Sequence, residues 1–266
     1  MSRSPGHLAA PLALLSGVAI VLAACGGGPS LPALTDPAEI IGVALKATEG
    51  AKSVHVEATV DGSISADLTG TGATGTKLPL TGTTAAGDVD MAGGKAHATF
   101  AIPAFLNLNG ELIQIGETSY VKTSLSGPLY ETEQATDSLP VDLTDASGMF
   151  DNLGDVLTAD GVDPIKGDDV SCGGKDCYTV SLQLTPEELA ALGVDQESAA
   201  GLPIDLGSTT LDVTIRVEKD TYRLAGMKTV ASLGEQGSVT VDLAFSKWDQ
   251  PMDISPPPAD QVKPAG

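Results

Sequence analysis

Residues 53–60 read Ser-Val-His-Val-Glu-Ala-Thr-Val, and this stretch decides the fold class. Every second residue from Val54 to Val60 is apolar, and a period of two predicts a half-buried β-strand. Asp61-Gly62 then indicates a turn, after which the alternation resumes from Ile64 to Leu68. A strand with one polar and one apolar face is typical of antiparallel sheets.

The same alternation returns along most of the chain. Strands are predicted over 83–91, 94–102, 111–115, 119–124, 177–184, 209–217, 221–233 and 236–246. Asn109-Gly110 and Lys219-Asp220 indicate turns between neighbouring strands. Many short strands joined by tight turns predict an antiparallel meander.

Three helices are predicted around these strands. Thr35-Asp36-Pro37 is a typical helix start, and this first helix ends at Gly50. Residues 144–158 place apolar side chains at helical spacing. Thr185 and Glu188 have the spacing of a capping box and begin a short third helix.

The order of these elements predicts an α+β fold. We expect a single curved antiparallel sheet with helices on one face and no linker that divides it. The Gly/Thr-rich stretch 69–84 is predicted as either a mobile loop or a hairpin, and the Pro-rich end after Trp248 as loosely structured.

The N-terminus carries an export signal. Leu22-Ala23-Ala24-Cys25 follows an apolar run of about 17 residues and has the bacterial lipobox pattern. We predict a signal peptide over 1–24 and a lipidated tether over 25–34. Cys25 would carry N-palmitoyl and S-diacylglycerol groups that hold the protein at the cell membrane, on its extracytoplasmic face. A short transmembrane helix or an ordinary secretory signal with an incidental cysteine are the alternatives.

Composition narrows the function classes. The net charge of −21 excludes a basic footprint for nucleic acid and argues against electrostatic binding to anionic headgroups. Aromatic residues make up only 3% of the chain, so ligands that stack on aromatic rings are disfavoured. An interior of small aliphatic side chains suits either a plain core or an alkyl-chain ligand.

Cys172 and Cys177 are the cysteines besides Cys25. Outside the cytoplasm a pair this close predicts a disulfide that closes a hairpin, with free thiols or a metal site as alternatives. The histidines after the signal, His55 and His97, lie far away in the sequence and fall on the polar faces of predicted strands. We therefore predict neither a metal nor a cofactor.

The sequence gives little support for a nucleotide-binding, calcium-binding or catalytic site. Residues 70–77 match Gly-x-Gly-x-x-Gly, but no helix is predicted after them to meet a pyrophosphate. Asp88-Val89-Asp90 and Asp168-Asp169 lack the further acidic residues of a calcium loop. The chain contains no Gly-x-Ser-x-Gly elbow. A Ser-His-Asp triad assembled from residues far apart in the sequence is the remaining alternative for catalysis. We predict that the protein is not an enzyme.

A family resemblance extends over nearly the whole chain after Cys25. The stretches that carry it are Ala51–Val56, Leu108–Leu112, Asp151–Leu153, Val162-Asp163, Ile165–Gly167 and Ser246–Pro251. In their order and coverage these stretches resemble the LppX/LprG-type lipoproteins of mycobacteria and other actinobacteria, the LppX_LprAFG family. The Cys172/Cys177 hairpin departs from the general pattern of that family.

The resemblance implies a fold and a function. Family members have a U-shaped antiparallel half-barrel with helices on its concave side and a large apolar cavity between them. They carry multi-acylated lipids and glycolipids from the plasma membrane towards the outer envelope. For this chain the resemblance implies a lipid-binding domain over 35–252, followed by a Pro-rich tail over 253–266. A membrane transporter is a possible partner, and we expect a monomer.

Candidate cavity residues are the apolar members of the predicted strand and helix stripes, each of which could equally belong to an ordinary core. They are Phe100, Ile102, Leu112, Met149, Phe150, Leu153, Leu157, Leu211, Val213, Ile215, Val239, Val241 and Leu243. The alternative function is an interaction or sensory lipoprotein with a filled core and no lipid cargo. Its recognition loop would be 69–84 or 194–208.

Overall fold

The computed structural model describes residues 31–66, 75–134, 161–191 and 206–264, together with Gly154 and Leu157. Leu31–Gly266 is one compact unit, and both hydrophobic cores described below lie inside it. A fragment that begins at Leu31 therefore keeps both cores. The predicted signal peptide, Cys25 and most of the predicted helix 144–158 lie outside the described residues.

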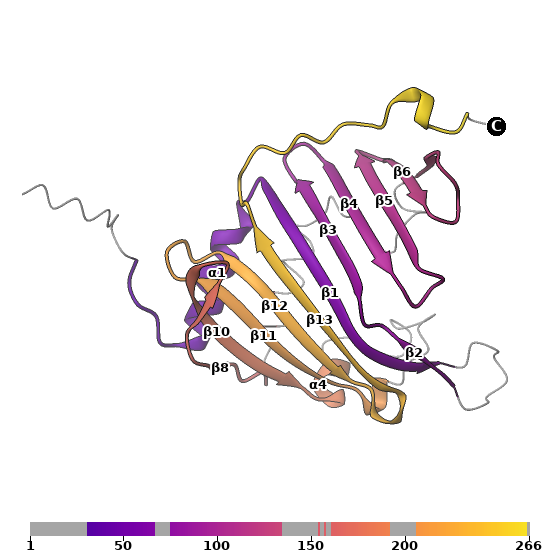
Figure 1. Ribbon diagram of the computed structural model, residues 1–266. Helices are drawn as coiled ribbons and strands as arrows, with labels where there is room; N and C mark the ends of the chain where they lie inside the picture. The colour runs from indigo at the N-terminus through magenta and orange to yellow at the C-terminus, as the bar shows by residue number, and fades with distance from the viewer. Residues whose placement is uncertain are drawn as a thin grey trace, which may run out of the picture. The chain divides into compact units, whose positions relative to one another are not determined.

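The described strands form one sheet, drawn in Figure 1. They are β1 (Ser53–Ala66), β2 (Thr76–Pro79), β3 (Thr83–Asp90), β4 (Lys95–Ile102), β5 (Leu108–Ile115), β6 (Thr118–Thr123), β7 (Glu131–Gln134), β8 (Ile165–Lys166), β9 (Val170–Cys172), β10 (Lys175–Leu184), β11 (Thr210–Glu218), β12 (Leu224–Ser232) and β13 (Gly237–Ser246). Each strand predicted from residue 83 onward has a counterpart whose bounds differ by three residues at most.

The sheet is antiparallel throughout and open. Its order is β7-β6-β5-β4-β3-β1-β13-β12-β11-β10-β8, with β2 added to β1 and β9 to β10. Within the described ranges no pairing joins the edge strands β7 and β8. β1 lies in the middle, where it pairs with β3 on one side and with β13 on the other. The predicted α+β class with a single antiparallel sheet is confirmed.

The predicted turn at Asp61-Gly62 is wrong, because β1 runs without interruption from Ser53 to Ala66. Gly62 is paired with Val239, and its φ of 106° lies in the region that favours glycine. A side chain at this position would collide with the backbone of Ser238. The glycine therefore permits a close strand–strand approach in the middle of β1.

The predicted turn at Asn109-Gly110 is also wrong, because both residues lie inside β5. The chain reverses instead over residues 103–107. Gly110 is directly opposite Phe100, and a side chain at Gly110 would meet the Phe100 ring. The glycine makes room for an aromatic ring on the neighbouring strand.

Helix α1 (Pro37–Glu49) begins and ends where the sequence predicts. The Asp36 carboxylate accepts a 2.8 Å hydrogen bond from the Glu39 backbone N–H, and Gly50 follows the last turn. Helix α4 (Pro186–Ala191) has the predicted capping box, in which Thr185 N–H donates to Glu188 Oε2 at 2.7 Å. No helix of the described residues is long and apolar enough to span a membrane.

The main core lies between α1 and the β10–β12 end of the sheet. Ile40, Ile41 and Ala44 of α1 are buried in one cluster with side chains of β10 and β11. Leu157 and Leu189 belong to the same cluster, so the described α-helical residues gather on this one face. This confirms the predicted placement of helices on one side of the sheet.

A second, smaller core lies on the other face, at β5 and β6. Ile113, Tyr130 and Ile254 are buried there. Tyr130 N–H donates to the Gln261 carbonyl at 2.8 Å, and Lys263 N–H donates to the Tyr130 carbonyl at 2.9 Å. The prediction of a loosely structured C-terminal end is therefore wrong, because this segment is fixed by apolar burial and by backbone pairing. Figure 1 shows it in yellow, running towards β6.

Charged side chains of the same face form a network beside this core. Glu111 is 2.9 Å from His97 Nε2 and 3.0 Å from Lys122 Nζ, and Lys122 also donates to the Tyr130 hydroxyl at 3.0 Å. Partial burial acts to raise the pKa of Glu111, but hydrogen bonds with Tyr130, Lys122 and His97 outweigh it. They lower the pKa from its ordinary value of 4.5 to about 2.

We predict that Glu111→Gln lowers the free energy of unfolding at pH 7 by on the order of 1 kcal/mol. The effect is small because solvent partly screens the contacts of Glu111 with His97 and Lys122. Because the pKa of Glu111 is lower in the folded than in the unfolded protein, its ionised carboxylate stabilises the fold. This stabilisation is complete above pH 4.5 and is lost as the pH falls towards about 2. Urea unfolding at pH 7 and pH 2.5 measures this difference. Glu117→Gln, in an exposed turn, is the control. A pH-independent effect of Glu111→Gln would contradict the network's role.

Candidate functional site

One face of the sheet is apolar from β5 to β10. Directly paired residues of an antiparallel sheet point to the same side, so the register identifies the members of this face. The pairs that cross it include Leu112–Ala98, Phe100–Ala85, Ala85–Ala58, Ala58–Leu243, Leu243–Met227, Met227–Ile215 and Ile215–Val180. We call this surface the apolar face.

The candidate cavity residues that lie in strands all belong to the apolar face. They are Phe100, Ile102, Leu112, Leu211, Val213, Ile215, Val239, Val241 and Leu243. Leu157 is buried in the main core with α1. Met149, Phe150 and Leu153 lie outside the described residues. Whether these residues touch a ligand stays a prediction.

The apolar face has two zones. Towards β10 and β11 it is closed, because Val213 and Ile215 are buried in the cluster that includes α1. Val54 and Phe245 of β1 and β13 are also buried in that cluster. Further along β1, β3, β4 and β13 the side chains of this face are only half-buried, among them Ala58, Phe100 and Val241. We call this second part the open zone. It keeps apolar surface accessible in the middle of the sheet.

Small residues form the floor of the open zone. Ala58, Ala85, Gly87 and Ala98 are neighbours across β1, β3 and β4 on the apolar face, and all four are half-buried. Short side chains cover these strands with less bulk than leucine or phenylalanine would. The list of candidates from the sequence missed these residues because it favoured large side chains. The period-two pattern around Phe100 already marks Ala98 as a member of the same face.

The opposite face is polar. His55 Nδ1 is 2.6 Å from Asp88 Oδ1, and His97 Nε2 is 2.9 Å from Glu111 Oε1. Both histidines thus lie on the predicted polar side, each beside a carboxylate. No group of three His, Cys, Asp or Glu side chains suited to a metal ion occurs among the described residues.

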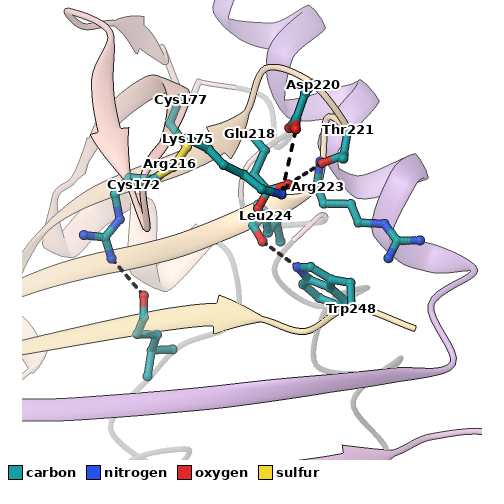
Figure 2. Close-up of a disulfide and its surroundings, with 11 residues drawn as sticks. Cys172, Lys175, Cys177, Arg216, Glu218, Asp220, Thr221, Arg223, Leu224 and Trp248 are labelled. Atoms are coloured by element: carbon teal, nitrogen blue, oxygen red, sulfur yellow. Dashed lines mark hydrogen bonds and ion pairs between the residues drawn. A yellow bond between two sulfur atoms is a disulfide. The ribbon is translucent and has the colours of Figure 1, made fainter. Parts of the chain in front are cut away.

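A disulfide hairpin stands at the end of this polar face (Figure 2). Cys172 and Cys177 are bonded, with their Cα atoms 6.0 Å apart, across the turn of β9 and β10 at Gly173-Gly174. The disulfide predicted from the sequence is present in the structure. Cys177 is fully buried.

Glu218 fixes this hairpin to the turn between β11 and β12. Its carboxylate, on a residue only 8% exposed, accepts hydrogen bonds from Lys175 Nζ at 2.7 Å and from Thr221 Oγ1 at 2.6 Å. Trp248 lies beside the start of β12, where its indole N–H donates to the Leu224 carbonyl at 3.0 Å. Trp248 is therefore a packing anchor.

A pocket of about 480 Å³ lies between the hairpin and Trp248. Glu57 and Ala244, which face each other on the polar side, place it on that face. Its walls carry charged side chains, including Lys175, Arg223 and Lys247. It is thus a pocket of mixed charged and apolar lining on the polar face, distinct from the apolar cavity that the resemblance implies.

The architecture has counterparts among solved structures. LprF from Mycobacterium bovis matches 83% of this chain and 96% of its own, with 21% identity and a TM-score of 0.55. The chain shares the fold of LprF. The resemblance predicted from the sequence is thereby confirmed at the level of the fold.

Other matches are more distant. The lipoprotein LppX from Mycobacterium tuberculosis covers 83% of this chain and 100% of its own, at 17% identity and a TM-score of 0.49. A LolA superfamily protein from Nitrosomonas europaea covers 86% of this chain and 99% of its own, at 11% identity and a TM-score of 0.28. No protein-family model and no curated protein matches the chain.

We predict that Cys172→Ala with Cys177→Ala lowers the free energy of unfolding by about 2 kcal/mol, because the bond closes only a short loop. Denaturant unfolding with and without a reductant measures the effect. The reductant should destabilise the unaltered protein and leave the double variant unchanged. Equal stability of the unaltered protein under both conditions would show that the bond does not form in solution.

Proposed function

We propose that this protein is an envelope lipoprotein that binds multi-acylated lipids or glycolipids and carries them from the plasma membrane towards the outer envelope. The open zone of the apolar face is the observation that carries the proposal. Its floor of small residues and its half-buried aliphatic side chains provide an apolar surface without charged groups.

Acyl chains fit such a surface on energetic grounds. Each methylene removed from water contributes about 0.8 kcal/mol, so a lipid with several chains can bind without a specific polar contact. The aliphatic composition of the chain suits this mode of binding, since no ring stacking is required. The packed core beneath α1 stabilises the fold through apolar burial.

The fold of LprF supports the proposal, together with the family resemblance carried by the sequence. The predicted anchor at Cys25 adds a physical reason. A body with a net charge of −21 is repelled by anionic headgroups, so a lipid anchor would be needed to keep it near a membrane. We propose binding and transfer as the activity, with no catalysed reaction.

We predict that Ala98→Phe reduces the amount of bound lipid severalfold, because the ring would occupy space above the floor of the open zone. Native mass spectrometry of the protein purified from an actinobacterial host gives the lipid-to-protein ratio. Thr99→Phe is the matched control, since Thr99 is exposed and lies on the polar face of the same strand.

Equal lipid content in both variants would place the ligand elsewhere. The absence of co-purifying lipid from the unaltered protein would contradict the carrier and favour an interaction or sensory lipoprotein with a filled core. Thermal unfolding of both variants establishes that they are folded.

We further predict that Cys25→Ala abolishes lipidation and leaves the precursor uncleaved, because the lipobox cysteine is both the acylated residue and the first residue after the cut. Intact-mass spectrometry of membrane fractions measures both changes. An acylated or normally cleaved Cys25→Ala protein would contradict the anchor.

A further inference from the structure

The charges of the turns are unevenly distributed over the two ends of the strands. At the end where β4, β6 and β12 finish, Glu235 lies in the β12–β13 turn, but three other turns are uncharged. At the end where β5 and β11 finish, the turns carry charged residues such as Glu117, Lys219 and Asp220. At the end to which the arrows of β4 and β6 point in Figure 1, residues 78–87, 102–110 and 123–130 contain no charged side chain. Three neighbouring turns are therefore uncharged in a protein whose net charge is −21.

These three turns touch one another. A Cβ atom on Gly82 would lie 3.4 Å from the Pro103 ring, so the β2–β3 turn borders the β4–β5 turn. Ser124 N–H donates to the Asn109 carbonyl at 2.8 Å, which joins the β4–β5 hairpin to the segment after β6. We call residues 80–82, 103–107 and 124–127 the uncharged rim.

The uncharged rim presents large apolar side chains to solvent. Phe105 is 51% exposed, Leu106 83% and Leu125 64%. These are half of the exposed large hydrophobic residues among the described ones, and the other members, such as Ile165, lie outside the rim. Exposed apolar clusters of this kind mark interaction surfaces.

The backbone holds Leu106 outward. Leu106 and Asn107 both have a φ of 55°, in the left-handed region that residues with a side chain adopt at a cost. Asn107 N–H donates to the Pro103 carbonyl at 3.2 Å, and Leu108 N–H to the Phe105 carbonyl at 2.8 Å, which fixes the turn. A strained turn that exposes a leucine points to function at that leucine.

We propose that the uncharged rim inserts Phe105, Leu106 and Leu125 into the surface of a lipid bilayer, and that it is the edge through which lipid enters and leaves the apolar face. This inference rests on the proposed function for the role in transfer. The contact with the bilayer stands on the geometry of the rim alone.

A lipid bilayer fits this surface for two reasons. An acidic protein approaches anionic headgroups most readily where it carries little negative charge of its own. The residues of the rim are uncharged, and the Asp61 carboxylate, which accepts a hydrogen bond from the Thr81 hydroxyl, lies beside its 80–82 part. The rim also continues the apolar face, because Ile102 and Leu108 are paired on that face at the base of the turn. Acyl chains could pass from the bilayer to the open zone without crossing a charged side chain of these turns.

Vesicle flotation tests the contact. The fragment that begins at Leu31 is used, because it contains both hydrophobic cores and lacks Cys25. It is mixed with phosphatidylcholine vesicles, with and without phosphatidylglycerol. We expect it to float with both, and we expect Leu106→Asp with Leu125→Asp to lower the bound fraction by about tenfold or more, since two exposed leucines that would enter the bilayer become charged. Ile165→Asp, at a 69% exposed position outside the rim, is the matched control and should bind as the unaltered fragment does.

A second readout separates this proposal from the carrier function. Native mass spectrometry of the full chain should find the same lipid in the unaltered protein and in Leu106→Asp/Leu125→Asp, while lipid transfer between vesicles falls with vesicle binding. Flotation without any co-purified lipid would keep the membrane contact and overturn only the carrier function. An unaltered fragment that does not float, or an equal loss of flotation with Ile165→Asp, would overturn the membrane contact.

Discussion

The double pairing of β1 is the constraint on which the rest of the structure depends. β1 follows the first helix, yet it pairs with β3 on one side and with β13, the last strand, on the other. Val56 is thereby placed opposite both Gly87 and Phe245. A slip of one residue would turn every side chain of β1 to the other face, so the hydrophobic effect fixes this register strongly. Among the described strands, β3–β7 on one side and β8–β13 on the other are joined into one sheet only through β1.

The separation of the two faces follows from that register. On the apolar face α1 covers the β10–β12 end and makes a packed core, while the middle of the sheet keeps a floor of small residues. On the polar face the charges are paired locally, as at Glu111 and at Glu218. The C-terminal segment covers the apolar side chains that this face retains at β5. Stability and the proposed binding surface thus come from different parts of one sheet.

Sequence patterns predicted most of the strands because period-two alternation fixes which side chains share a face. This is also why the strand candidates from Phe100 to Leu243 gather on the apolar face. The turns at Asp61-Gly62 and Asn109-Gly110 were wrong because these glycines lie inside strands and permit close contacts with the neighbouring strands. The short strands β7 and β8 carry no alternation of their own and exist through their pairing with longer neighbours. The division into a closed and an open zone depends on where α1 packs, which no local pattern encodes.

Site-specific photo-crosslinking on β3 tests the central claim most directly. A photoreactive phenylalanine analogue is placed at Ala85, on the apolar face, or at its neighbour Ala86, on the polar face, and the protein is irradiated as purified from an actinobacterial host. The account predicts a covalent lipid adduct, detected by intact mass, from position 85 and none from position 86. Lipid that co-purifies yet crosslinks equally from both positions, or only from position 86, would contradict it.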